Sequence, residues 1–296
     1  MTDPFSRYHP FVNLIYFALV IGFSMVVDHP LAQIISLASS VTYVVSTQSK
    51  KSVAFLLKFC LPLVLLTAFI NPVFNHEGKT ILLYLSNGNP LTLESILYGF
   101  SSGCMIVTLF LWFSAFSVVM TSDKFIYLFG KVIPSLSLVL SMTLRFVPKF
   151  KKQMKNVADA QRCIGRDVSN GSLLNRTKTA ITIISIMITW SLENAIETAD
   201  SMKSRGYGLK GRTTFSIYCF EDRDKYTLVW FLFCFLYLLA GVIVSVFDFR
   251  YFPDIQYSTF DIMTISFYVM YLGLCITPVV LNTVEDIKWK TIYSKM

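Results

Sequence analysis

Two segments of the sequence place arginine beside glycine where a helix is predicted to end. They read 158-ADAQRCIGRD-167 and 199-ADSMKSRGYG-208, and in both a glycine stands seven residues after the first alanine. An arginine guanidinium is a planar fork of donors that pairs with carboxylates or caps free carbonyls. Small neighbouring residues would let such a helix end enter a groove of another protein. The candidate contact residues are Arg162, Gly165, Arg166, Ser204, Arg205 and Gly206.

A purely structural interpretation of the same residues also exists. Arginine near the C-terminus of a helix interacts favourably with the helix dipole and satisfies free carbonyls. Gly206 and Gly208 suit a C-cap that needs a left-handed backbone. The docking interpretation is favoured because the pattern occurs twice, at the ends of helices that belong to one segment.

The helices that would carry these ends are amphipathic. Residues 149–165 form a polar helix with a mostly apolar line of Phe150, Met154, Val157, Gln161 and Ile164, and a second helix runs from about Leu173 to Arg205. Pro148 is expected to separate the first helix from an apolar stretch, 125–146. Whether 125–146 and the apolar stretch 179–190 enter a bilayer stays open.

The rest of the chain is typical of a membrane protein. Of its 296 residues 54% are hydrophobic and 15% charged, whereas a soluble domain carries about a quarter charged residues. Six apolar runs approach or exceed the length needed to span a bilayer: Phe11–Val27, Leu31–Thr47, Val53–Ile70, Ile96–Thr121, Tyr226–Phe247 and Ile262–Val284. The predicted fold is an all-α integral membrane protein with about six transmembrane helices and long cytoplasmic helices between the fourth and fifth spans.

Charge predicts the orientation of these spans. Residues 123–225 contain 17 basic and nine acidic residues, a net charge of +8 that equals the charge of the whole chain. Basic residues favour the cytoplasmic side of a membrane. This segment and both termini are therefore predicted to lie on the cytoplasmic side of the plasma membrane. The expected division is 1–122 and 226–296 for the membrane helices and 123–225 for the cytoplasmic or interfacial part.

Several apparent motifs carry no chemistry. The triplet 78-GKT-80 resembles the end of a phosphate loop, but Val73 stands where that loop needs its first glycine. The six cysteines and three histidines have no metal-binding spacing. We interpret the line of Glu193, Glu197 and Asp200 as a solvent-exposed face of the second helix. We therefore predict no catalytic residue, no metal, no cofactor, no nucleic-acid partner and no hydrolysis of ATP by the chain itself.

Two other function classes compete with docking. A stand-alone secondary transporter usually keeps ionisable groups in mid-membrane, but among the six predicted spans only the third contains one, Lys58. A membrane enzyme would need a cluster of His, Asp or Cys, and the sequence shows none.

The two helix ends resemble those of the transmembrane T components of energy-coupling factor (ECF) transporters. The resemblance covers residues 5–225 and rests on these segments: 8-YHPFVNLIYF-17, 142-MTLRFVPKF-150, 158-ADAQRCIGRD-167, 199-ADSMK-203 and 204-SRGYG-208. With the glycines aligned, the arginine position of the family motif falls on Ile164 in the first end. Arg162 and Arg166 flank that position, and either of them would make the contact.

The resemblance implies an assembly of several proteins. Two cytoplasmic ABC-type ATPases would each receive one arginine–glycine helix end, and a separate membrane S component would bind a vitamin or metal ion. The chain would sit in the lipid bilayer and pass ATP-driven motion from the ATPases to the S component. The transported substrate, and whether one S component or several are served, would be properties of the partner.

Overall fold

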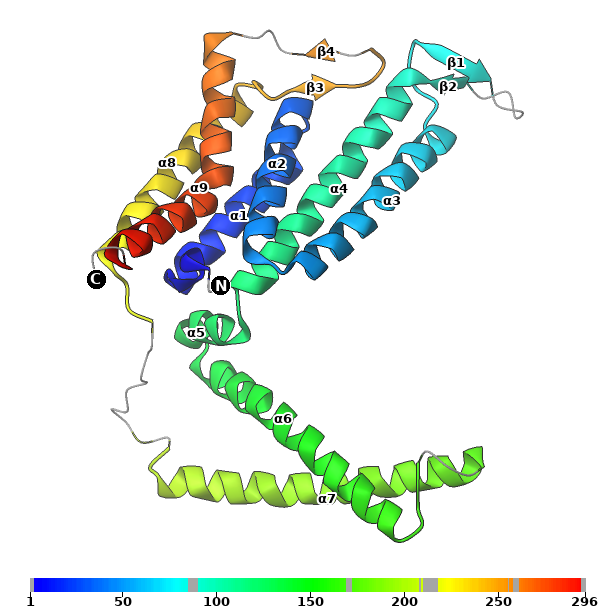
Figure 1. Cartoon of the computed structure of the whole chain (residues 1–296), viewed down its shortest axis with the longest axis vertical. Coiled ribbons are helices and arrows are strands. Elements are labelled where there is room, and N and C mark those ends of the chain that lie inside the picture. The colour runs from blue at the N-terminus through cyan, green and yellow to red at the C-terminus, as the bar shows by residue number, and fades with distance from the viewer. Residues whose placement is uncertain are drawn as a thin grey trace. The chain divides into compact units, whose positions relative to one another are not determined.

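The computed structural model describes residues 3–84, 90–168, 172–207, 209, 218–254, 256–257 and 261–293 (Figure 1). The chain divides into two units, the first made of Met1–Phe125 and Tyr218–Met296 and the second of Ile126–Ile217. Gly208 of the second arginine–glycine segment lies outside the described residues.

The first unit is a bundle of membrane-length helices. It contains η1 (Pro4–Arg7), α1 (Pro10–Val26), α2 (Pro30–Thr47), α3 (Lys50–Phe74), α4 (Leu93–Val119), α8 (Asp222–Ile243) and α9 (Ile262–Tyr293). Helix α5 (Ser122–Val132) begins in this unit and continues into the second, which holds α6 (Pro134–Cys163) and α7 (Leu173–Ser204). Two antiparallel hairpins, β1 (Ile81–Tyr84) with β2 (Pro90–Thr92) and β3 (Phe249–Arg250) with β4 (Gln256–Tyr257), complete the first unit.

The fold class is confirmed, since all six predicted spans are helical. In the described chain, five helices are long and apolar enough to cross a membrane: α2, α4, α7, α8 and α9. Helix α1 and the stretch Lys58–Phe74 of α3 are apolar but shorter. Helix α7 contains the apolar stretch 179–190, whose relation to the bilayer the sequence left open.

Two His-Pro pairs start the first two spans. The Nδ1 atom of His9 accepts a hydrogen bond from the Phe11 amide at 3.2 Å, and that of His29 accepts one from the Leu31 amide at 3.3 Å. Proline follows at the first helical position, where its missing amide hydrogen costs nothing. Each histidine therefore acts as an N-cap, a role that sequence reasoning did not assign to it.

Buried aromatic and hydroxyl side chains join the helices of the bundle. The Trp112 indole of α4 donates to Ser36 Oγ of α2 at 3.0 Å, and Ser36 lies 2.8 Å from Ser24 Oγ of α1. Ser24 in turn lies 3.1 Å from the Tyr271 hydroxyl of α9. Hydrogen bonds between helices are a main source of cohesion where lipid removes the hydrophobic driving force.

The expected helix break at Pro148 is wrong. Pro148 lies within α6, which runs unbroken over 30 residues. An interior proline removes one backbone hydrogen bond and costs about 3 kcal/mol. In α6 the side chains on both sides of Pro148 still pack, because Phe146 contacts Phe150 and Phe150 contacts Trp190 of α7. The connection between α3 and α4 includes the hairpin β1–β2.

The two ends of the bundle differ. Figure 1 shows η1, the start of α8 and the end of α9 at one end, with both hairpins at the other. An ion pair of 2.7 Å between Lys79 and Asp254 links the two hairpin regions. The end of α4 also lies at the η1 end of the bundle.

Candidate functional site: two arginine–glycine helix ends

The second unit is built on a crossed pair of helices, α6 and α7 (Figure 1). At the crossing, the Phe150 ring of α6 meets Trp190 of α7 edge to face, with centroids 5.3 Å apart. The ammonium of Lys149 lies 5.5 Å from the Trp190 ring and donates to Asn194 Oδ1 at 2.6 Å. Ile183 and Met187 of α7 are buried there. The crossing holds both helices and thereby positions both of their C-terminal ends.

The end of α6 closes in a Schellman motif, a left-handed C-cap with two characteristic backbone hydrogen bonds. The Arg166 amide donates to the Gln161 carbonyl at 3.0 Å, and the Gly165 amide donates to the Arg162 carbonyl at 3.0 Å. Gly165 has φ of +79°. That value is cheap only for glycine, which explains why glycine ends this helix.

The end of α7 closes in the same way. The Tyr207 amide donates to the Met202 carbonyl at 3.0 Å, and the Gly206 amide donates to the Lys203 carbonyl at 3.0 Å. Gly206 has φ of +74°. The two ends therefore share one backbone geometry, and the glycines occupy equivalent positions.

Because the two glycines occupy equivalent positions, the residues on either side of them can be compared directly. Ile164 holds the position before Gly165, as Arg205 does before Gly206, and Arg166 holds the position that Tyr207 has after it. Each glycine is thus flanked by one arginine and one large apolar or aromatic residue, in opposite order. Both apolar partners are exposed, Ile164 by 63% and Tyr207 by 46%.

The guanidinium groups at the first end differ in their contacts. Arg162 Nε lies 3.6 Å from Asp167 Oδ2, within the helix end itself. Arg176 Nε donates to the Val168 carbonyl at 2.7 Å and ties the following loop to the first turn of α7. Arg166 is exposed, and its guanidinium makes no bond to the described part of the chain.

Arg205 at the second end resembles Arg166. It is exposed, and among the described residues its guanidinium has no ion pair or hydrogen-bond partner. The neighbouring Ser204 hydroxyl donates to the Ser201 carbonyl at 2.9 Å. All six predicted site residues thus lie at two helix ends, which Figure 1 shows on opposite sides of the α6–α7 crossing.

Sequence reasoning missed Gln161 at the first end. Its side-chain Oε1 is buried and has no hydrogen-bond partner in the described structure. A buried acceptor without a donor is costly. The backbone carbonyl of Gln161 accepts the hydrogen bond from the Arg166 amide in the Schellman motif, so the Gln161 side chain belongs to this helix end. It is therefore a candidate to receive a donor from a bound partner.

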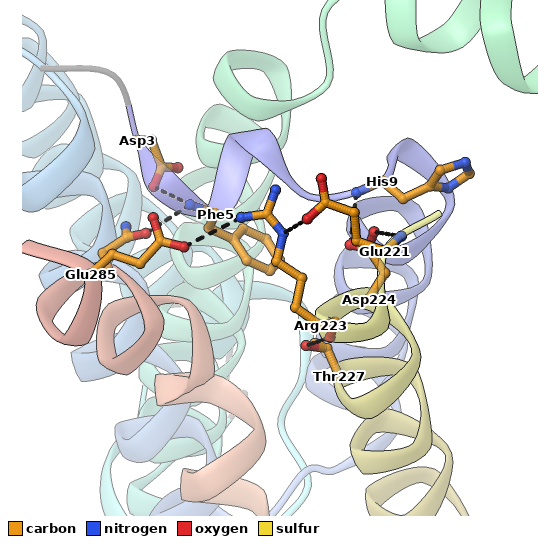
Figure 2. A network of polar contacts seen from close by, with 9 residues as sticks. Asp3, Phe5, His9, Glu221, Arg223, Asp224, Thr227 and Glu285 are labelled. Atoms are coloured by element: carbon orange, nitrogen blue, oxygen red, sulfur yellow. Dashed lines mark hydrogen bonds and ion pairs between the residues drawn. The ribbon is translucent and has the colours of Figure 1, made fainter. Parts of the chain in front are cut away.

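A second cluster that sequence reasoning missed anchors the chain where it leaves and enters the second unit (Figure 2). Asp224 at the start of α8 accepts from the His9 amide at 3.1 Å and from the Glu221 amide at 3.0 Å. Arg223 forms ion pairs with Glu221 at 2.8 Å and Glu285 at 3.6 Å. His9 thereby ties the N-terminal segment to the start of α8, and Arg223 ties the start of α8 to Glu285 of α9.

The same N-terminal segment also holds the start of α5. Lys124 is 4% exposed, and its ammonium donates to the carbonyls of Ser6 and Val119 and to the Ser6 hydroxyl. Burial lowers the pKa of Lys124 to about 8, and the nearby Asp3 carboxylate opposes that shift. The amine is therefore still charged at neutral pH, as its three acceptors require.

The acidic residues of α7 form neither a buried nor a metal-binding group among the described residues. Glu193, Glu197 and Asp200 are exposed on α7, as expected of a solvated face. In the described part of the chain, no group of three or more His, Cys, Asp or Glu residues could hold a metal ion.

Fold and helix ends together define a class: multi-pass, all-α membrane proteins with a crossed helix pair that presents two arginine–glycine ends. The chain belongs to the CbiQ family, described as cobalt transport proteins, because the model of that family matches residues 2–216. Membership agrees with the resemblance to T components noted from the sequence.

Relatives with established names support the same family. The chain is 33% identical over 118 residues to the energy-coupling factor transporter transmembrane protein EcfT of Lactobacillus helveticus, covering 40% of this chain and 41% of the relative. It is 29% identical over 170 residues to EcfT 1 of Listeria monocytogenes, covering 52% and 62%. It is 27% identical over 207 residues to EcfT of Listeria innocua, covering 64% and 76%. The first two matches thus span less than two thirds of the relatives' lengths.

Proposed function

We propose that the chain is the scaffold and energy-coupling subunit of an ECF-type importer. In this proposal, two cytoplasmic ABC-type ATPases bind its two arginine–glycine helix ends, and a membrane S component brings a vitamin or metal ion. The chain itself is non-catalytic, lies in the plasma membrane and has both termini in the cytoplasm. The substrate is chosen by the S component.

One observation carries this proposal: the same Schellman end occurs twice on one crossed helix pair. Each copy presents an exposed arginine whose guanidinium has no partner in the described chain. Two copies of one docking element suit two copies of one kind of partner. A guanidinium pairs well with carboxylates that line a groove, and the packing at the crossing allows the pair to move as one element between two arrangements.

Purification from native membranes tests the proposal. We expect two ABC-type ATPases and a small membrane protein to co-purify with the chain and to be identified by mass spectrometry. In proteoliposomes, uptake should require all of these proteins together with ATP. Solute uptake by the purified chain alone would instead identify a secondary transporter and overturn the proposal.

Single replacements at the first helix end should separate its two arginines. We expect Arg166→Ala to weaken ATPase binding about tenfold or more, since a hydrogen bond from a charged donor contributes about 1.5–3 kcal/mol. Arg162→Ala should weaken it less than threefold, because Arg162 already pairs with Asp167. Titration of the purified ATPases against each variant measures both effects. A larger effect of Arg162→Ala would reverse the assignment.

A further inference from the structure

The hairpin end of the first unit contains two adjoining cavities outside the helix ends described above. One, of about 280 Å³, lies between α2, α4 and the segment that follows β3. The other, of about 220 Å³, lies beside the α1–α2 turn and β3. Asp28, Phe249 and Arg250 line both cavities. The two cavities therefore meet along these three residues.

A buried hydroxyl without a partner faces the larger cavity. Tyr251 lines that cavity and is 8% exposed, and its hydroxyl makes no hydrogen bond in the described structure. Ser101 lies near enough to lower the pKa of this phenol, while burial raises it more. The Ser101 hydroxyl donates to Gln33 Oε1 at 2.6 Å, and although its oxygen lies close to the phenol, the geometry between the two is not that of a hydrogen bond. Since buried polar groups are nearly always paired, the Tyr251 hydroxyl points to a ligand.

The charges around the cavities are of opposite sign and are not neutralised by each other. Asp28 and Arg250 line both cavities and Asp248 lines the smaller one, yet none of the three forms an ion pair with a described residue. Partial burial raises the pKa of Asp28. A ligand with one negative and one positive group would neutralise both.

Aromatic rings form one wall of the larger cavity. The Tyr98 ring lies 5.4 Å from both Tyr251 and Phe252, and Phe249 lies 4.6 Å from Tyr251. Aromatic faces attract ammonium groups. The smaller cavity is bordered by the apolar residue Val26 at the end of α1, which is 60% exposed. An apolar chain attached to the ligand would therefore leave the cavity along the exposed apolar surface at Val26.

We propose that these two cavities bind a phosphate–ammonium zwitterion, the headgroup of a zwitterionic phospholipid such as phosphatidylethanolamine. Arg250 and the Tyr251 hydroxyl bind the phosphate, and Asp28 and the aromatic wall face the ammonium. The acyl chains run past Val26 into the bilayer. The site lies at the end of the bundle opposite η1 and is independent of the arginine–glycine helix ends.

Lipid binding to the purified chain in detergent tests this proposal. We expect phosphatidylethanolamine to be retained in native mass spectrometry and to raise the thermal unfolding midpoint. Phosphatidylglycerol, which has phosphate but no ammonium, should bind at least tenfold more weakly. Soluble glycerophosphoethanolamine distinguishes the source: if it binds as tightly as the lipid, the zwitterion site stands and the natural ligand is a free solute. Equal binding of the two lipids would overturn the proposal.

Variants locate the binding on these residues. Arg250→Gln and Tyr251→Phe should each weaken phosphatidylethanolamine binding about tenfold, whereas Tyr226→Phe, on an exposed ring, should leave it unchanged. Without lipid, Tyr251→Phe should keep or raise the unfolding midpoint, because it removes an unpaired buried hydroxyl and keeps the ring. A lower midpoint without lipid, or unchanged lipid binding in Tyr251→Phe, would show that the hydroxyl is structural and would overturn the site.

Discussion

Replacing Arg205 with glutamate is expected to abolish co-purification of the ATPases and to stop ATP-driven uptake in the reconstituted importer. Arg205 precedes the left-handed Gly206 at the end of α7, is exposed and has no partner for its guanidinium in the described chain. Its loss removes a charge-assisted pair, and the new carboxylate repels the groove that the arginine is proposed to enter. Together these effects should weaken binding about 100-fold or more.

The variant should leave the chain itself folded. The backbone hydrogen bonds of the α7 end are made by Gly206 and Tyr207 to the carbonyls of Lys203 and Met202, and none of them uses the Arg205 side chain. Glutamate near a helix C-terminus costs at most about 1 kcal/mol through the helix dipole. We therefore expect the thermal unfolding midpoint to stay close to that of the parent chain.

Lys203→Glu provides the matched control for this prediction. It makes the same change of charge in the same helix turn but on a residue that does not flank the glycine. Loss of binding in both variants would mean that the net charge of the helix end, and not the arginine, attracts the partner. Arg205→Lys, which keeps the charge and loses the guanidinium fork, should have an intermediate effect. Full binding and uptake in Arg205→Glu would contradict the proposed function.

The local features of this chain could be predicted from its sequence. The six spans follow from apolar runs, and the two helix ends follow from glycines that sit behind small residues at the same spacing. Even the position of Ile164 in the first end follows from aligning the glycines, and the shared backbone hydrogen bonds confirm that alignment. Such features depend on a few neighbouring residues, which the sequence shows directly.

Features that depend on distant residues could not be predicted in this way. Pro148 is a helix breaker by local rules, yet the aromatic contacts of Phe150 with Trp190 hold α6 together on its far side. Two of the three acceptors of Lys124 belong to Ser6, 118 residues away, and His9 meets Asp224 across 215 residues. Which of two arginines at the first end has a free guanidinium likewise depends on a side-chain contact, that of Arg162 with Asp167.

Lys124→Met is the second variant for which we expect a large effect, here on stability. Lys124 is buried at the start of α5, two residues before the second unit begins, and its ammonium satisfies the Ser6 and Val119 carbonyls. Methionine fills a similar volume but donates no hydrogen bond, so both carbonyls lose a charged donor in a buried place. Each buried polar group without a partner costs about 1–3 kcal/mol, and we expect the free energy of unfolding to fall by about 3 kcal/mol.

Lys225→Met is the matched control for the loss of stability expected in Lys124→Met. Lys225 pairs with Asp222 at 2.8 Å, but both side chains are mostly exposed, and a solvent-exposed pair of this kind contributes little to stability. Unfolding in micelles with increasing fractions of denaturing detergent measures both variants. A fall in Lys124→Met no larger than that in Lys225→Met would mean that the N-terminal segment is not fixed through this ammonium. A selective fall would identify Lys124 as the residue that anchors the chain where it passes from the membrane bundle to the helices that carry the arginine–glycine ends.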